Sequence, residues 1–297
     1  MQNPRPSTMS SPKRIAALLA AALVLNACGA EASTATAEVP QRATTNCAAG
    51  ENNAGVTIGP NWGGGQERNL TIVAVSSGAG VDPAIGGLAL TTPISARASA
   101  QQDVIDLVWS VGDTTLPDGT VWQEVAAAAE ANAQIDLTGG ILTLESTDDE
   151  QTNQQVVDDI ELYSYSTSIG EGEVLSGFTT LINPLTAQSQ EAIETIEHLG
   201  TDEQGCELVR LTRHIGPQEI IDDLDGLLED LEDPAQRPEA FADLGFDGAI
   251  LRTATYRFDN ETGQTRSVEL TEAWGIFGAG GIDTRVITRE ITDTSDL

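Results

Sequence analysis

The chain has 297 residues, with 14 lysines and arginines against 46 aspartates and glutamates, so its net charge is −32. This charge excludes nucleic acid and anionic membrane surfaces as electrostatic partners, because both are negative. An apolar share of 40% is too high for a wholly disordered chain, and the length suits one or two domains with a sizeable core. The acidity fits either adaptation to a saline habitat or a cation-binding surface.

The first 27 residues have the pattern of a secretory signal. Arg5, Lys13 and Arg14 form a positive segment, and an apolar run over 15–25 follows them. Residues 25–28, Leu-Asn-Ala-Cys, then resemble the bacterial lipobox, although Asn26 replaces the small or β-branched residue usual there. The resemblance implies a lipoprotein whose lipidated first residue is Cys28, anchored in the membrane at the outer face of the cell. The alternative is a soluble secreted protein cleaved after residues 30–32, Ala-Glu-Ala.

The remaining two cysteines, Cys47 and Cys206, can form one disulfide in an oxidising compartment. The alternative is two unpaired thiols. Residues 28–66 are rich in Ala, Thr, Asn and Gly, so we expect a flexible tether, in which Trp62 is a candidate docking point. This leaves 67–297 as the folded domain.

Hydrophobic periodicity predicts mostly strands in the first half of that domain. In chain order we expect a strand at 69–76, a loop at 78–93, a helix or a strand at 101–111, an alanine-rich helix at 121–133, and strands at 141–144 and 156–169.

The last third has clearer patterns. In chain order we expect a helix at 184–199 with Gly200 after it, a strand at 206–213, helices at 220–231 and 238–244, strands at 250–258 and 265–274 joined by a hairpin turn, and a last strand at 284–292. This order predicts an α+β domain in which amphipathic helices cover an antiparallel sheet.

Three motifs in this last third resemble the LolA-like, lipid-carrying lipoproteins of actinobacteria. They are the strand 207–212, the acidic leucine-rich helix 220–231, and the turn 258–263 (Phe-Asp-Asn-Glu-Thr-Gly) leading into 264–274. The similarity runs from 184 to the end of the chain and implies a curved antiparallel sheet, a half-barrel, that encloses an apolar cavity under its helices. Candidate lining residues are the inward positions of the late strands: Val209, Leu211, Ala254, Tyr256, Phe258, Val268, Leu270 and Trp274. An ordinary packed core is the alternative for each.

Catalytic and metal-binding motifs fit poorly. The two histidines, His198 and His214, each stand at the end of a predicted element, His198 in the last turn of a helix. The acidic run 222–226 lacks the first acid of a calcium loop, because Ile221 stands there. We therefore expect no cofactor, no metal and no enzyme, but an envelope lipoprotein that binds or carries an apolar ligand, most simply a lipid. The alternatives are a surface interaction module with a solid core, and a hydrolase, which a His or Ser converging with a carboxylate would indicate.

Overall fold

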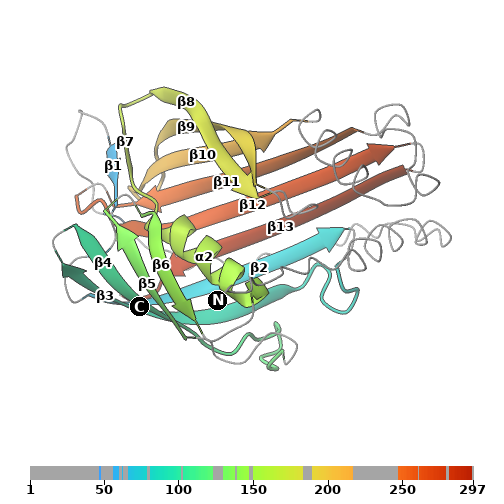
Figure 1. Ribbon diagram of the computed structural model, residues 1–297, viewed down its shortest axis with the longest axis horizontal. Helices are drawn as coiled ribbons and strands as arrows, with labels where there is room; N and C mark the ends of the chain where they lie inside the picture. Colours follow the sequence, from blue (N-terminus) through green and yellow to red (C-terminus); the bar gives the residue numbers. More distant parts are fainter. Residues whose placement is uncertain are drawn as a thin grey trace, which may run out of the picture. The chain divides into compact units, whose positions relative to one another are not determined.

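The computed structural model describes residues 47, 56–59, 62, 66–78, 81–101, 103–122, 130–137, 139–146, 150–182, 189–216, 247–259, 261–278 and 281–295. Most of them belong to one antiparallel sheet of eleven strands in the order β6-β5-β4-β3-β2-β13-β12-β11-β10-β9-β8 (Figure 1). These strands are β2 (Glu67–Gly78), β3 (Ala89–Gln101), β4 (Val104–Val111), β5 (Glu130–Asp136), β6 (Ile141–Ser146), β8 (Val174–Ile182), β9 (Ser189–Thr201), β10 (Glu207–Ile215), β11 (Asp247–Phe258), β12 (Thr265–Gly278) and β13 (Gly281–Asp293).

Three further elements, one helix and two short strands, complete the described fold. The helix α2 (Glu150–Ser164) connects β6 to β7 (Thr167–Ile169), which pairs with β1 (Val56–Ile58) in a separate two-stranded sheet. The large sheet consists of two meanders, β2 to β6 and β8 to β13, which join where β13 pairs with β2. The first and last strands of the large sheet therefore lie side by side at its centre.

The strands form because apolar residues alternate along them with a period of two. In β4, for example, Ile105, Leu107 and Trp109 are buried, whereas the residues between them are partly exposed. The buried face of the sheet packs on α2 through Val156, Ile160 and Tyr163, in one core with residues from both meanders. Strands from both meanders contact the same helix face, so the sheet curves around α2 (Figure 1).

The C-terminal end of α2 is held by Trp62. The indole nitrogen of Trp62 donates a hydrogen bond of 2.9 Å to the Ser164 hydroxyl, and its ring meets the edge of Tyr163 with centroids 5.5 Å apart. Trp62 is 3% exposed. The tryptophan of the expected tether thus docks on the helix.

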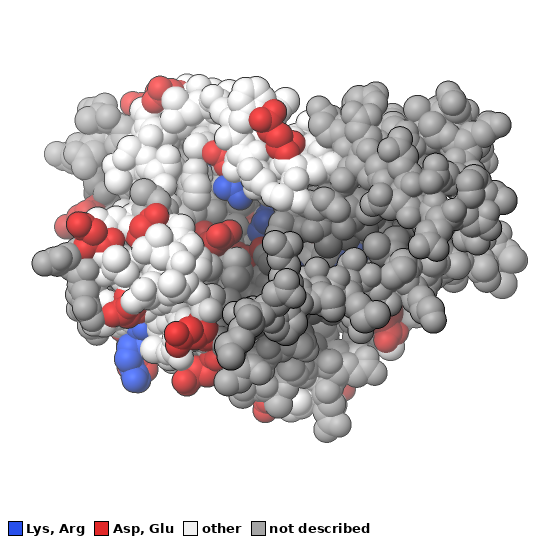
Figure 2. Space-filling view, in the orientation of Figure 1, with Lys and Arg blue, Asp and Glu red and all other residues white. Residues whose placement is uncertain are grey.

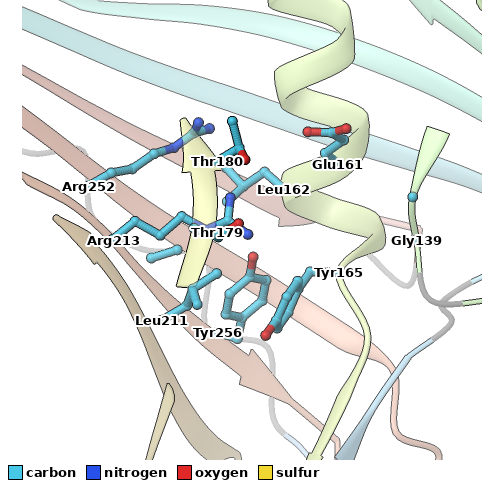
Figure 3. A pocket seen from close by; sticks show the side chains of 12 residues that line it. Gly139, Glu161, Leu162, Tyr165, Thr179, Thr180, Leu211, Arg213, Arg252 and Tyr256 are labelled. Atoms are coloured by element: carbon cyan, nitrogen blue, oxygen red, sulfur yellow. The ribbon is translucent and has the colours of Figure 1, made fainter. Parts of the chain in front are cut away.

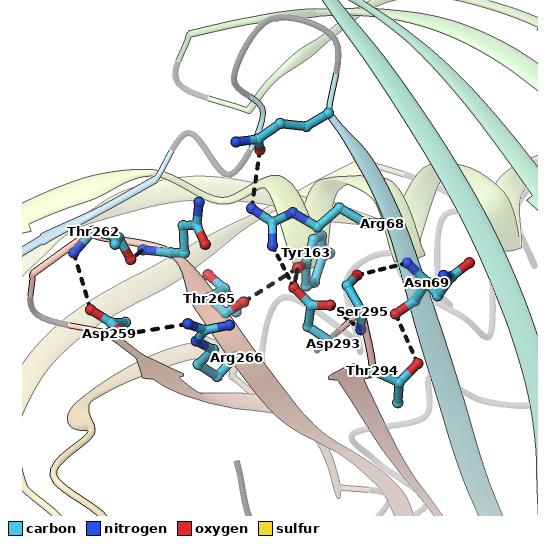
Figure 4. Close-up of polar contacts among 12 residues, drawn as sticks. Arg68, Asn69, Tyr163, Asp259, Thr262, Thr265, Arg266, Asp293, Thr294 and Ser295 are labelled. Atoms are coloured by element: carbon cyan, nitrogen blue, oxygen red, sulfur yellow. Dashed lines mark hydrogen bonds and ion pairs between the residues drawn. The ribbon is translucent and has the colours of Figure 1, made fainter. Parts of the chain in front are cut away.

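A buried ion pair lies beside this contact (Figure 4). Arg68 on β2 donates to Asp293 on β13 at 2.7 Å, and both side chains are buried. The Tyr163 hydroxyl donates to the Thr265 carbonyl at 3.3 Å and lies 3.4 Å from the same carboxylate. The helix is therefore tied to two central strands, β12 and β13, by polar contacts as well as by apolar packing, and Arg68 links β13 to β2.

The predicted disulfide between Cys47 and Cys206 is confirmed. The Cys47 N–H also donates to the Gln204 carbonyl at 3.2 Å. Together with β1 and Trp62, this bond packs every described part of the expected tether 28–66 against the domain.

The predicted α+β class, with helices covering the sheet, is wrong: among the described residues α2 is the only helix. Residues 189–199 of the predicted helix 184–199 lie in β9, and 130–133 of the predicted helix 121–133 lie in β5. The predicted strand 156–169 is instead the end of α2 followed by β7, and part of the loop expected at 78–93 belongs to β3. The predicted helices 220–231 and 238–244 lie outside the described residues.

Each wrong prediction has a physical reason. Segment 184–199 has apolar residues at helical spacing, but ladders to β8 and β10 on both sides override that preference. In 156–169 the β-branched and aromatic residues suggested a strand, whereas Val156, Ile160 and Tyr163 lie four and three apart on one helix face. The strands expected at 69–76, 141–144, 206–213, 250–258, 265–274 and 284–292 are confirmed as β2, β6, β10, β11, β12 and β13, and the ambiguous 101–111 contains β4.

Candidate functional site

Most of the predicted cavity residues lie in a packed core. Val209, Phe258 and Val268 are fully buried and Leu270 nearly so, in the cluster beneath α2. These four residues do not line the pocket that opens beside this core.

A pocket of about 320 Å³ opens beside this core (Figure 3). Its walls come from α2, the turn between β5 and β6, and strands β8, β10 and β11. The residues lining it are Gly139, Gly140, Glu161, Leu162, Tyr165, Thr179, Thr180, Leu211, Arg213, Arg252, Ala254 and Tyr256. Three of the predicted lining residues, Leu211, Ala254 and Tyr256, are among them. The other nine were not predicted.

The pocket forms where the inner face changes from apolar to charged. Along β10 the inward residues run Val209, Leu211, Arg213 and Ile215, and Arg213 is the register partner of Arg252 on β11. Beyond the two arginines lies a second buried cluster of Leu181, Ala192, Ile215 and Ile250, against which the predicted cavity residue Trp274 packs. A charged residue at an inward position of an alternating strand was the sequence signal for this site.

Acidic groups border the arginines. Nε of Arg213 donates to Glu194 on β9 at 2.8 Å, with both side chains largely buried. Glu161 stands on α2 at the opposite wall (Figure 3). Partial burial raises the pKa of Glu161, and the nearby carboxylate of Asp158 adds to the rise, while the two arginines oppose it.

Two tyrosines form the floor of the pocket toward the core. The rings of Tyr165 and Tyr256 stack with centroids 5.3 Å apart. Burial raises the pKa of both phenols, most strongly for the fully buried Tyr256. Both hydroxyls therefore stay protonated at neutral pH and can donate hydrogen bonds.

The surface around the pocket is acidic. In Figure 2 the red atoms of aspartate and glutamate are spread over the described surface, whereas blue atoms appear inside a central hollow and at one place on the lower left of the outer surface. The sequence contains no lysine after Lys13, so every basic side chain of the described domain is an arginine.

A histidine and a carboxylate do converge, at His198 and Glu207. His198 lies on β9 rather than at the end of a helix, and its Nε2 is 2.9 Å from Glu207. The N–H of Gly172 donates to Nδ1 at 3.2 Å, so Nδ1 is the acceptor and Nε2 carries the proton shared with Glu207. Because protein groups occupy both ring nitrogens, His198 has no nitrogen left to activate a nucleophile in this arrangement.

Among the described residues, no three His, Cys, Asp or Glu side chains are grouped to hold a metal ion. No helix in that part of the chain is long and apolar enough to cross a membrane. The predicted lipidation site Cys28 and the acidic run 222–226 lie outside the described residues.

Comparisons with known proteins do not place the chain in a family. No family model and no curated protein matches it. A solved structure of a conserved protein of unknown function with a hot dog fold, from Alicyclobacillus acidocaldarius, aligns over 78% of this chain and 80% of its own, at 12% identity and a TM-score of 0.12. That likeness is too low to support an argument about fold or function.

Proposed function

We propose that the protein is an exported lipoprotein, anchored at the outer face of the cell membrane through Cys28, that binds an apolar or amphiphilic ligand in the pocket beside α2. The observation that carries this proposal is the pocket itself. It opens directly beside a solid apolar core and has Leu162, Leu211 and Ala254 in its wall. Its volume of about 320 Å³ is at the lower end of the range for small-molecule sites, roughly 300–1,000 Å³.

Three features support export, and two of them also support anchoring. The Cys47–Cys206 disulfide is of a kind that persists in oxidising compartments. The lipobox-like residues 25–28 and the resemblance of the last third to lipid-carrying lipoproteins point to the same compartment. Replacing Cys28 by Ser should release the protein from membranes, and a variant that still fractionates with membranes would contradict anchoring through this residue.

Ligand binding is tested by filling the pocket. The register partner of Thr179 on β8 is the buried Ala192, so we expect the bulky side chain of Thr179→Trp to occupy the pocket. The matched control is Ser176→Trp on the same strand, at an exposed position that does not line the pocket. Uptake of a fluorescent fatty acid by the full chain should be lost in Thr179→Trp and kept in Ser176→Trp. Equal uptake by both variants would place binding elsewhere, and no uptake by the parent chain would reject the proposal.

A second candidate function is a surface interaction module, and one specific observation favours it. A row of outward side chains, apolar except for one histidine, crosses the sheet, in which register links Phe178, Ile193, His214, Leu251, Ala273 and Val286 on six successive strands. Phe178 is 75% exposed and Ile193 is 53% exposed. A contiguous exposed apolar patch marks an interaction site more often than isolated apolar residues do.

This second function has its own test. A photocrosslinking residue at position 178 should capture a partner in cells if the row is an interface. The same residue at position 142 is the control, because Leu142 is also exposed, at 54%, but lies outside the row. Crosslinks at both positions, or at neither, would count against a dedicated interface.

A further inference from the structure

The two arginines of the pocket oppose each other directly across a strand pair. Arg213 on β10 and Arg252 on β11 are register partners, and both line the pocket. Like charges at directly opposed positions of an antiparallel pair destabilise the sheet unless a negative group compensates them. The chain has only 14 basic residues, and two of them face this one pocket. The repulsion between these two arginines therefore requires a nearby anion.

Among the described residues, only one of the two arginines has an ion-pair partner. Arg213 is paired with Glu194 at 2.8 Å. Arg252 is half-buried and makes no hydrogen bond or ion pair with any residue that the structure describes, although Glu272 is its register partner on the other side. A guanidinium group carries five N–H donors in a planar fork that matches a carboxylate or a phosphate. The fork of Arg252 is thus open toward the pocket.

The remaining wall of the pocket is divided into a polar and an apolar part. Both guanidinium groups extend from their strands into the pocket near Thr179 and Thr180, whose hydroxyls can donate hydrogen bonds (Figure 3). Leu162, Leu211 and Ala254 supply the apolar part. A ligand that fits this wall has an anionic end and an apolar end.

We propose that the pocket binds an amphiphile by its anionic head group, a carboxylate or a phosphate, with Arg252 as the main anion-binding residue and Arg213 as the second. The apolar part of the ligand then lies against Leu162, Leu211 and Ala254. This inference rests on the proposed ligand-binding function and names the chemical class of the ligand. Hydrogen bonds from arginine to an anion are stronger than neutral ones and can be bidentate, so the head group sets both affinity and orientation.

The test compares three ligands that share a ten-carbon chain: decanoate, decyl phosphate and decanol. Titration calorimetry below the micelle concentrations would use the full chain with Cys28→Ser, which removes the predicted lipid. We expect at least one of the two anions to bind about 10- to 100-fold more tightly than decanol, the range for charge-assisted hydrogen bonds. The anion with the higher affinity identifies the head group.

Three variants assign the effect to Arg252. Arg252→Gln should reduce the affinity for the preferred anion about 10- to 100-fold and leave decanol binding unchanged, whereas Arg252→Lys should restore part of the loss. The matched control is Arg210→Gln, which removes an arginine from the opposite face of β10, where Arg210 pairs with Glu197 at 3.0 Å. It should bind like the parent chain. Because Arg252 has no described partner, its replacement should leave the fold intact, which circular dichroism would verify.

The possible failures are distinguishable. Equal affinities for decanol and both anions, with no effect of Arg252→Gln, would overturn the anion site and leave apolar ligand binding in place. If none of the three ligands binds, the proposed function itself fails and the anion site fails with it. If Arg210→Gln weakens anion binding as much as Arg252→Gln does, the effect comes from net charge and the assignment to Arg252 is wrong.

Discussion

The inner face of the sheet has a closed region and an open region along the same strands. In the closed region, at the C-terminal end of α2, Tyr163 and Phe258 are fully buried and the core is solid. Further along β10 and β11, the pocket opens beside Leu211 and Ala254, and the next inward residues on these strands are Arg213 and Arg252. The ladder between the two strands continues without interruption through both regions. The difference therefore comes from side-chain chemistry and not from the backbone.

The two regions also differ in how deeply their charged side chains are buried and how completely they are paired. In the closed region the ion pair of Arg68 and Asp293 is almost completely buried, with 8% and 2% of the side chains exposed. In the open region Arg213 and Glu194 are 23% and 21% exposed, and Arg252 has no partner among the described residues. The closed region pairs its buried charges within the protein, although Nε of Arg68 has no hydrogen-bond partner among the described residues. The open region leaves a whole guanidinium group without a described partner, as a binding site requires.

The largest expected effect is the loss of the buried ion pair. Arg68→Met should lower the free energy of unfolding by about 3–5 kcal/mol, because Asp293 would be left as a buried charge without its partner. The control Arg97→Met removes an exposed pair with Glu67, at 3.6 Å, and should cost at most about 1 kcal/mol. Urea unfolding of the full chain measures both. A similarly small loss for both variants would show that the pair in the closed region contributes no more than a surface pair.

The disulfide should contribute nearly as much. It joins Cys47 to Cys206 across 159 residues, and Cys206 is fully buried beside β10. Replacing both cysteines by serine should lower the free energy of unfolding by about 2–5 kcal/mol, the usual range for a native disulfide. Reducing agent should destabilise the parent chain by the same amount and leave the double variant unchanged. A parent chain insensitive to reduction would contradict the stabilising role.

A turn that borders both regions gives a smaller effect. Gly139 lies between β5 and β6 with φ +91°, and a Cβ atom there would overlap the Ser164 carbonyl at the end of α2. Gly139→Ala should therefore destabilise the protein by about 3 kcal/mol, from backbone strain and the displaced helix end. Gly119 has φ +83° with nothing near its Cβ position, so Gly119→Ala measures the strain alone, about 1 kcal/mol. Equal losses would mean that the helix end can move without cost.

The strands of the second meander could be predicted from the sequence, and β9 could not. The alternation in β10, β11, β12 and β13 is regular, and the turn at 259–263 is closed by the side chain of Asp259, which accepts hydrogen bonds from the N–H groups of Glu261 and Thr262. The apolar residues of β9 fit helical spacing as well as alternation. Only the ladders to its two neighbouring strands decide between these, and the spacing of apolar residues within β9 does not contain that information.

The residues of the pocket could likewise be predicted only where the strand that carries them was predicted. Leu211 and Tyr256 were found because the inward positions of well-predicted strands can be counted. Glu161 and Leu162 were missed because their helix was expected to be a strand. Thr179 and Thr180 were missed because no strand was expected at 174–182 and a helix was expected at 184–199. The arginines stood at inward positions that could be counted, but the expectation of an apolar cavity left them out.

The smallest effect concerns the carboxylate at the open end. Partial burial and the carboxylate of Asp158 raise the pKa of Glu161, so the folded state binds a proton more readily than the unfolded state does. Burying the charged carboxylate of Glu161 therefore lowers the stability of the folded state. This cost is absent below the pKa of about 4.3 that glutamate has in the unfolded chain, and it is fully present above the raised pKa of the folded state. Glu161→Gln removes a group that carries this cost at neutral pH. The variant should therefore be slightly more stable than the parent chain at pH 7, by about 0.5 kcal/mol or less, and equally stable at pH 4.

Two measurements separate this effect from the general benefit of removing one negative charge from an acidic chain. Glu145→Gln removes a charge from the outer face, since Glu145 is the register partner of the exposed Asn132, and urea unfolding at both pH values would compare the two variants. If Glu145→Gln gives the same gain as Glu161→Gln, the net charge explains it. Glu161 also competes with a bound anion for the two arginines, whereas Glu145 does not. Glu161→Gln alone should therefore tighten the binding of the preferred ten-carbon anion at pH 7, and the gap should close as the pH falls and Glu161 becomes neutral in the parent chain.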